Sequence, residues 1–258
     1  MAILEVKNLT VGYGAPVVRD VSFCLRAGEV VGLLGRNGSG KTTLLRGLCG
    51  SAKVLGGTAL LGGENCLTMK PRQRARHLAL LAQRTELLAG LRAGEVITMG
   101  GYARQGVFER PGPAEEKRAR QAAARLGVEA LWDRDCAALS EGQRQLVHLA
   151  RVTAQETEVL LLDEPSSALD FTNTHRLFGC VRGLAREENR AALVVLHDPA
   201  LALRWCDRLL RLEEGRLTGE LTTAQAAPEQ VQTFLQPLYP GLLVRKDEES
   251  RTFYCVIA

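Results

Sequence analysis

The sequence contains no long hydrophobic run and no segment typical of export. Uninterrupted apolar stretches such as Ala191–Leu196 are far shorter than the roughly 18–20 residues that cross a bilayer as a helix. The start, MAILEVKNLT, lacks the charged segment and following apolar stretch of a signal peptide. We therefore expect neither a membrane-spanning helix nor secretion.

Closely spaced cysteine pairs and a large charge excess are also missing. The seven cysteines never form a C-x-x-C motif. We therefore expect them to be small buried hydrophobic side chains rather than metal ligands, in a protein of a reducing compartment. The 33 basic and 29 acidic residues leave a formal net charge of +4, which gives no indication of a nucleic-acid partner. Arginine outnumbers lysine 27 to 6, and codon usage explains this more simply than a phosphate-rich partner does.

The apolar pattern of the 258 residues indicates an α/β fold. Alternation of apolar and polar residues over Ile3–Val11 and Val17–Leu25 predicts two half-buried antiparallel strands. Glu29–Leu34, Val159–Leu162 and Ala192–Leu196 are short continuous apolar runs, typical of strands covered on both faces. Because helical patterns lie between such runs, we predict a mostly parallel sheet with an N-terminal antiparallel β subdomain.

Residues 84–150 form a segment of a different kind, rich in Ala, Arg, Leu and Glu and helical in pattern at Glu115–Leu126. We predict an inserted helical subdomain, broken by a loop in which Pro111 and Pro113 stop any helix. Further prolines interrupt the tail that follows, which ends in a predicted hairpin. The expected layout is a single domain with an ATP-binding core (1–83 and 151–220), a helical subdomain (84–150) and a short C-terminal tail (221–258).

Gly35–Thr42 reads G-R-N-G-S-G-K-T and matches the phosphate-loop pattern G-x-x-x-x-G-K-[ST]. Its glycines let backbone N–H groups surround a phosphate, and the following helix adds its positive N-terminal end. Lys41 can reach the β- and γ-phosphates, and Thr42 supplies a hydroxyl to Mg²⁺. The pattern predicts a P-loop NTPase core with these nucleotide-binding residues: Gly35, Asn37, Gly38, Ser39, Gly40, Lys41, Thr42 and Thr43.

The run Val159–Glu164 is a hydrophobic strand that delivers two acids at its carboxyl end. Asp163 is predicted to hold Mg²⁺, and Glu164 is then free to act as general base on the attacking water. On their own, two acids after a strand are usually a solvated turn. The phosphate loop upstream favours the catalytic interpretation instead.

Five further motifs occur in a fixed order around these two. Leu139–Gln143, L-S-E-G-Q, resembles the L-S-x-G-Q signature of the ATP-binding cassette (ABC) ATPases. Ser167–Asp170 resembles the D-loop of that family, His197 its switch histidine, Gln83 its Q-loop glutamine and Tyr13 its adenine-stacking aromatic residue. With the phosphate loop and the acidic strand, seven motifs span residues 13–198, so the whole cassette resembles this family.

The resemblance implies a site shared between two chains. Ser140, Gly142 and Gln143, at the start of the predicted helix Arg144–Arg151, would bind the nucleotide held by a partner's phosphate loop. His197 would contact the γ-phosphate and hold Glu164 in line. The implied cofactors are ATP and Mg²⁺. The implied roles are catalytic for Glu164, His197 and Gln83, metal-binding for Thr42, Gln83 and Asp163, and nucleotide-binding for Tyr13, Ser140, Gly142, Gln143 and Asp170.

Tyr13 lies between Gly12 and Gly14, which we interpret as clearing space for a flat base. An aromatic face stacks on adenine with little discrimination by hydrogen bonds. We therefore expect only modest selectivity for ATP over GTP.

Three stretches indicate a branch of the family. Val96–Tyr102, Leu169–Asn173 and Leu196–Asp207 resemble the ATPases of iron-siderophore, haem and cobalamin uptake systems. The resemblance implies a homodimer, or a pair with a similar chain, beneath a separate permease that contacts residues 84–106. A substrate-binding protein would act outside the membrane. The chain itself would sit peripherally on the cytoplasmic face of a bacterial cell membrane.

One alternative stays open at this point. A soluble ABC ATPase that assembles iron–sulfur clusters or another complex would keep every catalytic motif and bind a scaffold through the surface Gln83–Gly106. A non-catalytic binding module would require a decayed site, whereas Lys41, Asp163 and Glu164 are all present. The tail after residue 220 is too short for the regulatory domain of some importers, so we expect no feedback through one.

Overall fold

The fold is built around a six-stranded sheet with the order β10-β9-β3-β8-β7-β6, in a computed structural model that describes residues 2–83, 90–106, 109–247, 249 and 252–257. Five of these strands, from β9 to β6, run parallel to one another. At one edge, β10 pairs antiparallel with β9. The strands are β3 Val30–Leu34, β6 Leu78–Leu81, β7 Val159–Asp163, β8 Ala191–Val195, β9 Arg208–Glu213 and β10 Arg216–Thr222. The prediction of a mostly parallel sheet is confirmed.

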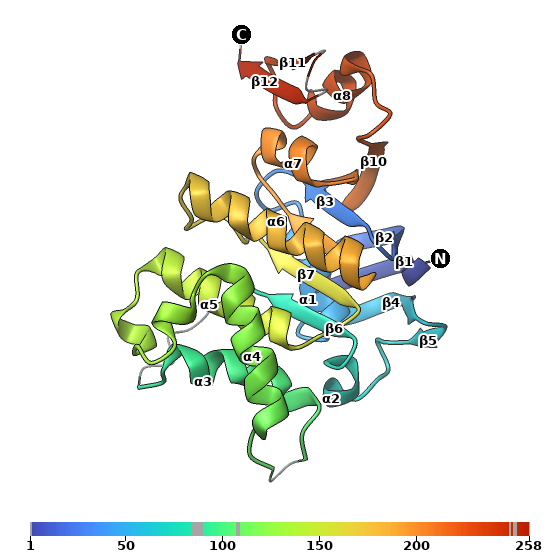
Figure 1. Cartoon of the computed structure of the whole chain (residues 1–258). Helices are drawn as coiled ribbons and strands as arrows, with labels where there is room; N and C mark the ends of the chain where they lie inside the picture. Colours follow the sequence, from blue (N-terminus) through green and yellow to red (C-terminus); the bar gives the residue numbers. More distant parts are fainter. Residues whose placement is uncertain (1, 84–89, 107–108, 248, 250–251, 258) are drawn as a thin grey trace.

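An antiparallel sheet of order β2-β1-β4-β5 lies beside this one (Figure 1). Its strands are β1 Ala2–Tyr13, β2 Ala15–Arg26, β4 Lys53–Leu61 and β5 Glu64–Asn65. The two N-terminal strands were predicted, and β4 was not. The paired glycines of β4 interrupt the alternation of apolar and polar residues, so the sequence gives no clear strand pattern there. The structure requires glycine at one of them: Gly57 has a φ of +86°, and a Cβ there would lie 2.4 Å from the Asn8 carbonyl oxygen.

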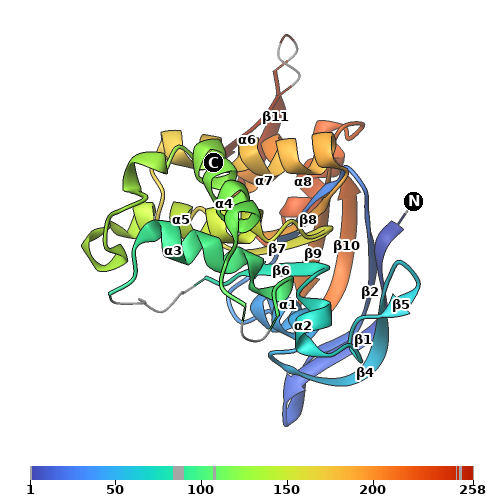
Figure 2. The same cartoon turned by 60° about the horizontal axis from the view of Figure 1, so that its bottom comes forward.

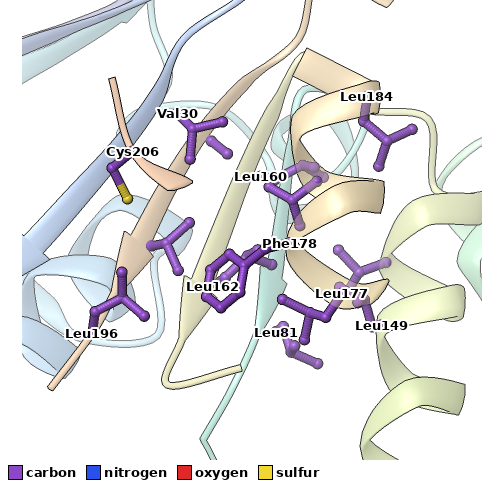
Figure 3. Close-up of a cluster of buried hydrophobic side chains, with 14 of the residues drawn as sticks. Val30, Leu81, Leu149, Leu160, Leu162, Leu177, Phe178, Leu184, Leu196 and Cys206 are labelled. Carbon is purple, nitrogen blue, oxygen red and sulfur yellow. The ribbon is translucent and has the colours of Figure 1, made fainter. Parts of the chain in front are cut away.

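The central strands are buried on both faces. On one face Leu160 and Leu162 lie against Phe178 of helix α6 (Phe171–Glu188), as Figure 3 shows. On the other face Leu161 and Leu193 belong to a second core, which includes helix α1 (Lys41–Cys49) and the antiparallel sheet. Two covered faces explain why these strands are continuous apolar runs rather than alternating ones.

The described residues of 84–150 form helices and irregular segments and no strand, with one isolated antiparallel bridge between Arg92 and Asp135. Figures 1 and 2 show this segment on the side of the six-stranded sheet away from the antiparallel strands. Helix α5 extends beyond the predicted Arg144–Arg151 at both ends. Pro113 does not stop a helix but begins one, because the first helical position needs no N–H donor. The helices here are α3 Ala93–Thr98, α4 Pro113–Leu126 and α5 Glu141–Ala154.

The C-terminal tail contains a helix as well as the predicted hairpin. Pro228 is the first residue of α8 (Pro228–Leu235), so this proline begins an element rather than interrupting the tail. β11 (Leu242–Lys246) and β12 (Phe253–Ile257) pair antiparallel, and β12 lies against α7 (Pro199–Trp205). A short helix, α2 (Pro71–Arg74), precedes β6. Within the described residues no helix is both long and apolar enough to cross a membrane.

Candidate active site

The phosphate loop connects β3 to α1, as its sequence predicts. Gly38 and Gly40 have φ values of +80° and +103°, which residues with a Cβ rarely adopt. A Cβ at Gly35 would lie 2.4 Å from the Leu212 carbonyl oxygen. The Lys41 ammonium is buried within the loop and donates to the carbonyl oxygens of Gly35 at 2.7 Å and Arg36 at 3.0 Å. The loop is therefore closely fitted around its lysine.

A cleft of about 790 Å³ brings the phosphate loop together with residues from three later parts of the chain. Of its lining residues in the described part of the chain, only Val17 of β2 was not predicted; an apolar residue in an alternating strand gives no sign of a site. The lining residues are Val17, Asn37, Gly38, Ser39, Gly40, Lys41, Thr42, Thr43, Gln83, Glu164 and His197.

Glu164 is held between the two other predicted catalytic residues. Its Oε2 accepts a hydrogen bond from Gln83 Nε2 at 2.8 Å, and its Oε1 lies 2.5 Å from His197 Nε2. The three residues follow β6, β7 and β8, whose carboxyl ends meet at one edge of the sheet. Glu164 has a φ of +50°, unusual for a residue with a side chain. The backbone turn thus aims its carboxylate into the cleft.

Asp163 supplies oxygen ligands suited to Mg²⁺. Its side chain is buried, and Oδ1 has no hydrogen-bond partner among the described residues. Burial raises the pKa of Asp163, while a hydrogen bond from the Thr42 hydroxyl opposes that rise. Burial lowers the pKa of Lys41, while the negative charges of Glu164 and Asp163 act to raise it. An unpaired carboxylate oxygen beside a hydroxyl fits a hard cation that takes its remaining ligands from phosphate and water.

The signature residues lie outside this cleft. Ser140 is the N-cap of α5: its hydroxyl accepts from Gln143 N at 3.3 Å, and its own N–H donates to Gln143 Oε1 at 3.1 Å. Gly142 lies against the D-loop, where a Cβ would be 2.9 Å from the Ala168 carbonyl oxygen. Asp170 caps α6 in the same way, accepting from Asn173 N at 2.8 Å. These predicted nucleotide ligands do not meet the phosphate loop of their own chain.

One contact that the sequence did not indicate connects the two regions. The buried amide of Gln145, on the signature helix α5, donates to the carbonyl oxygen of Pro165 at 3.2 Å. Pro165 directly follows Glu164. The signature helix is thereby tied to the backbone that carries the predicted general base.

Tyr13 has a 58% exposed side chain at the turn between β1 and β2. The structure gives its flanking glycines another reason than space for a base. A Cβ at Gly12 would lie 2.0 Å from the Ala15 carbonyl oxygen, and Gly14 has a φ of +98°. The tight turn itself therefore requires both glycines.

The fold and cleft define a P-loop nucleoside triphosphatase. Residues 18–167 match the ABC transporter family model, which is more than half of the chain. The chain is 40% identical over 226 residues to the hemin import ATP-binding protein HmuV of Bordetella pertussis, covering 84% of this chain and 85% of that protein. It is 34% identical over 229 residues to the petrobactin import ATP-binding protein FpuD of Bacillus anthracis, covering 88% and 82%.

A solved structure of a transporter assigned to the metal-chelate type, in an inward-facing conformation, is also similar. It matches with a TM-score of 0.81 at 25% identity, covering 100% of this chain and 96% of that one. The chain therefore belongs to the ABC transporter family and carries its ATPase cassette. The resemblance inferred from the seven motifs is confirmed.

Proposed function

We propose that the chain is the ATP-hydrolysing subunit of an importer for an iron complex, haem or a siderophore, or for cobalamin. Relatives that cover most of its length are named for hemin and petrobactin import. The observation that carries the enzymatic part is the position of Glu164, held between Gln83 and His197 at the edge of the phosphate-loop cleft.

In this proposal Glu164 accepts the proton of the water that attacks the γ-phosphate. His197 and Gln83 fix the orientation of the carboxylate. The side-chain carbonyl oxygen of Gln83 accepts no hydrogen bond from the described residues, so it can face water or metal. Lys41 exchanges its two backbone carbonyl partners for phosphate oxygens. Thr42, Asp163 and Gln83 would hold Mg²⁺, which neutralises phosphate charge when bound.

The signature residues serve a second chain in this proposal. Ser140, Gly142 and Gln143 stand at the N-terminus of a 14-residue helix, a position that favours anions, yet they do not line the cleft of their own chain. Head-to-tail pairing of two chains would place them, with Asp170, on the nucleotide of the partner. The exposed ring of Tyr13 would stack on adenine in each site.

The permease would dock on the helical segment near residues 84–106. The first part of that surface, 84–89, lies outside the described residues. The described part includes α3 and Tyr102, whose side chain is 53% exposed. We retain the proposed division into core (1–83, 151–220), helical subdomain (84–150) and tail (221–258), and place the chain peripherally at the cytoplasmic face of a bacterial membrane. An extracytoplasmic binding protein would contact only the permease.

Affinity purification from detergent-solubilised membranes tests this proposal. A tagged chain with Glu164→Gln should retain a polytopic membrane protein, because slow hydrolysis prolongs the ATP-bound state. Cells carrying that variant should lose uptake of labelled haem, siderophore or cobalamin, while cells carrying Glu187→Gln, an exposed carboxylate elsewhere, should not. Repeated recovery with soluble partners alone, together with unchanged uptake, would favour a soluble assembly ATPase instead.

A further inference from the structure

A three-residue segment of the C-terminal tail, Pro237–Tyr239, makes hydrogen bonds to two loops of the candidate active site. We call it the tail bridge. The Tyr239 hydroxyl donates to the backbone carbonyl oxygen of His197 at 2.7 Å. Two residues earlier, the Pro237 carbonyl oxygen accepts a hydrogen bond from Arg36 Nη2 of the phosphate loop at 2.9 Å. The tail bridge thus joins the two strand-end loops that carry Lys41 and His197.

The tail bridge is itself held firmly. Tyr239 N donates to the Leu235 carbonyl oxygen at 3.0 Å, and Leu242 N donates to the Tyr239 carbonyl oxygen at 3.1 Å, so α8 and β11 anchor its two ends. The Leu238 side chain is buried in the hydrophobic core that also contains side chains of α6 and α7. Burial, with the neighbouring charge of Asp198, raises the pKa of Tyr239 to about 12. A tyrosine hydroxyl is already protonated at neutral pH, and this rise keeps the Tyr239 phenol a donor at higher pH as well.

The loop that carries His197 is fixed on both sides as well. Leu196 N donates to the Leu33 carbonyl oxygen at 3.2 Å, which continues the sheet. Asp198 caps α7 by accepting from Ala200 N at 2.8 Å. Tyr239 acts between these two points, on the carbonyl of the residue whose ring contacts Glu164. A small rotation of this peptide would move the His197 ring away from the carboxylate.

We infer that Tyr239 is a positioning residue for ATP hydrolysis: through the His197 carbonyl it keeps the His197 ring on Glu164, while Arg36 fixes the other end of the tail bridge to the phosphate loop. The inference rests on the proposed function, since it assigns the tail a role in the same reaction. It also gives the short tail a direct part in the active site, without any regulatory domain.

A nucleotide-free measurement tests the positioning separately from turnover. The chain has four histidines, whose imidazole nitrogens can be followed by ¹⁵N NMR. Tyr239→Phe, which removes only the hydroxyl, should shift or broaden the His197 signals and leave those of His77 and His148 unchanged. The matched control is Tyr254→Phe, an exposed tyrosine of the same tail, which should shift neither His197 nor these two. Unchanged His197 signals in Tyr239→Phe would overturn the inference.

Kinetics provide the second test. With ATP as substrate and the chain bound to its permease, Tyr239→Phe should lower kcat about tenfold and change KM for ATP less than about twofold, because a lost hydrogen bond displaces a catalytic group without touching the nucleotide. Tyr254→Phe should match the wild type. In a His197→Ala background the same hydroxyl removal should have no further effect, since there is no ring left to position.

The outcomes separate the inference from the proposed function. An equal fall in kcat in both backgrounds, or none in the wild-type background, would show that Tyr239 does not act through His197. If the wild-type complex hydrolysed no ATP, the proposed function would fail, and the NMR comparison would still decide whether Tyr239 positions the His197 ring.

Discussion

The two regions that we propose to bind phosphate differ in how far one chain completes them. In the cleft, the phosphate loop, Gln83, Glu164 and His197 come from separate strand ends and line one cavity, where Glu164 contacts both Gln83 and His197. In the signature region, the hydrogen bonds of Ser140 among the described residues stay within its own helix cap. The proposed hydrolytic residues are thus already assembled within one chain, whereas the signature region is a helix N-terminus with no phosphate loop of its own chain beside it. The difference favours a site completed by a second chain.

The largest expected effect tests that sharing directly. Ser140→Arg should abolish ATP hydrolysis, because a long cation at the helix N-terminus conflicts sterically and electrostatically with a partner's phosphate loop. Lys41→Ala should also be inactive, from the other side of the site. A mixture of the two variants should recover part of the activity, since one of its two composite sites is intact. The rate of phosphate release from permease-bound chains measures this.

The matched control places the same arginine elsewhere. Ser51→Arg, at an exposed position after α1, should retain the wild-type rate. Wild-type activity in Ser140→Arg, or no recovery on mixing, would contradict the composite site and make each cleft self-sufficient.

The next largest effect concerns the cleft alone. Glu164→Gln should slow hydrolysis on the order of 10²-fold or more, because the amide cannot accept the proton of the attacking water. ATP binding should persist, since Lys41 and Asp163 are untouched. Equilibrium binding of a fluorescent ATP analogue and single-turnover hydrolysis measure the two parts. A variant with wild-type turnover would remove Glu164 from the role of general base.

The sequence predicted the cleft well for a physical reason. Most of its parts are encoded locally: a glycine-rich loop between an apolar strand and a helix, and Glu164 and His197 directly after other apolar strands. Gln83 was identified by the family resemblance alone, because the strand before it, β6, was not predicted. Parallel strands then bring Gln83, Glu164 and His197 to one edge without further information. The signature cap was also predictable, because Ser140 and Gln143 form a capping box within four residues.

The contacts that connect these parts could not be predicted. Tyr239 lies 42 residues from His197, and Arg36 lies 201 residues from Pro237. Each depends on where the whole tail packs, and no periodic pattern marks either residue. The contact between Gln145 and Pro165 depends in turn on how α5 packs beside the end of β7, which no local pattern indicates.

A smaller effect is expected at Tyr13, on the rim of the proposed adenine site. Tyr13→Ala should weaken ATP binding about three- to tenfold, the usual range for the loss of one aromatic stacking contact. Tyr13→Phe should keep the affinity. Tyr102→Ala, which removes another exposed tyrosine ring from the helical segment, is the matched control in the same fluorescence titration. Equal affinity in Tyr13→Ala and the wild type would show that the base lies elsewhere.

The smallest expected effect is on the thermal stability of the helical segment that carries the signature helix, with no effect on the cleft. Glu115 of α4 accepts from Arg104 Nη2 at 2.6 Å, and Arg104 in turn donates to the Ala154 carbonyl oxygen at the end of the signature helix at 2.9 Å. A Cβ at Gly101 would lie 2.3 Å from the Glu115 carboxylate, so this glycine makes room for the pair. The hydrogen bond from Arg104 holds the pKa of Glu115 below its ordinary value, against the opposing effect of burial.

The folded state therefore favours the ionised carboxylate of Glu115. Its contribution to stability is complete above the unfolded pKa of about 4.3 and is lost as the pH falls through the lower folded value. Glu115→Gln should lower Tm at pH 7 by about 2–4 °C and reduce the fall in Tm between pH 7 and about pH 3, which spans the window below the unfolded pKa. Glu116→Gln, which breaks the exposed pair with Arg120, should shift Tm less at either pH. ATP affinity should stay unchanged in both variants, because no residue of α4 lines the cleft. If Glu115→Gln also lost ATP affinity, the helical segment would be shown to support the cleft itself.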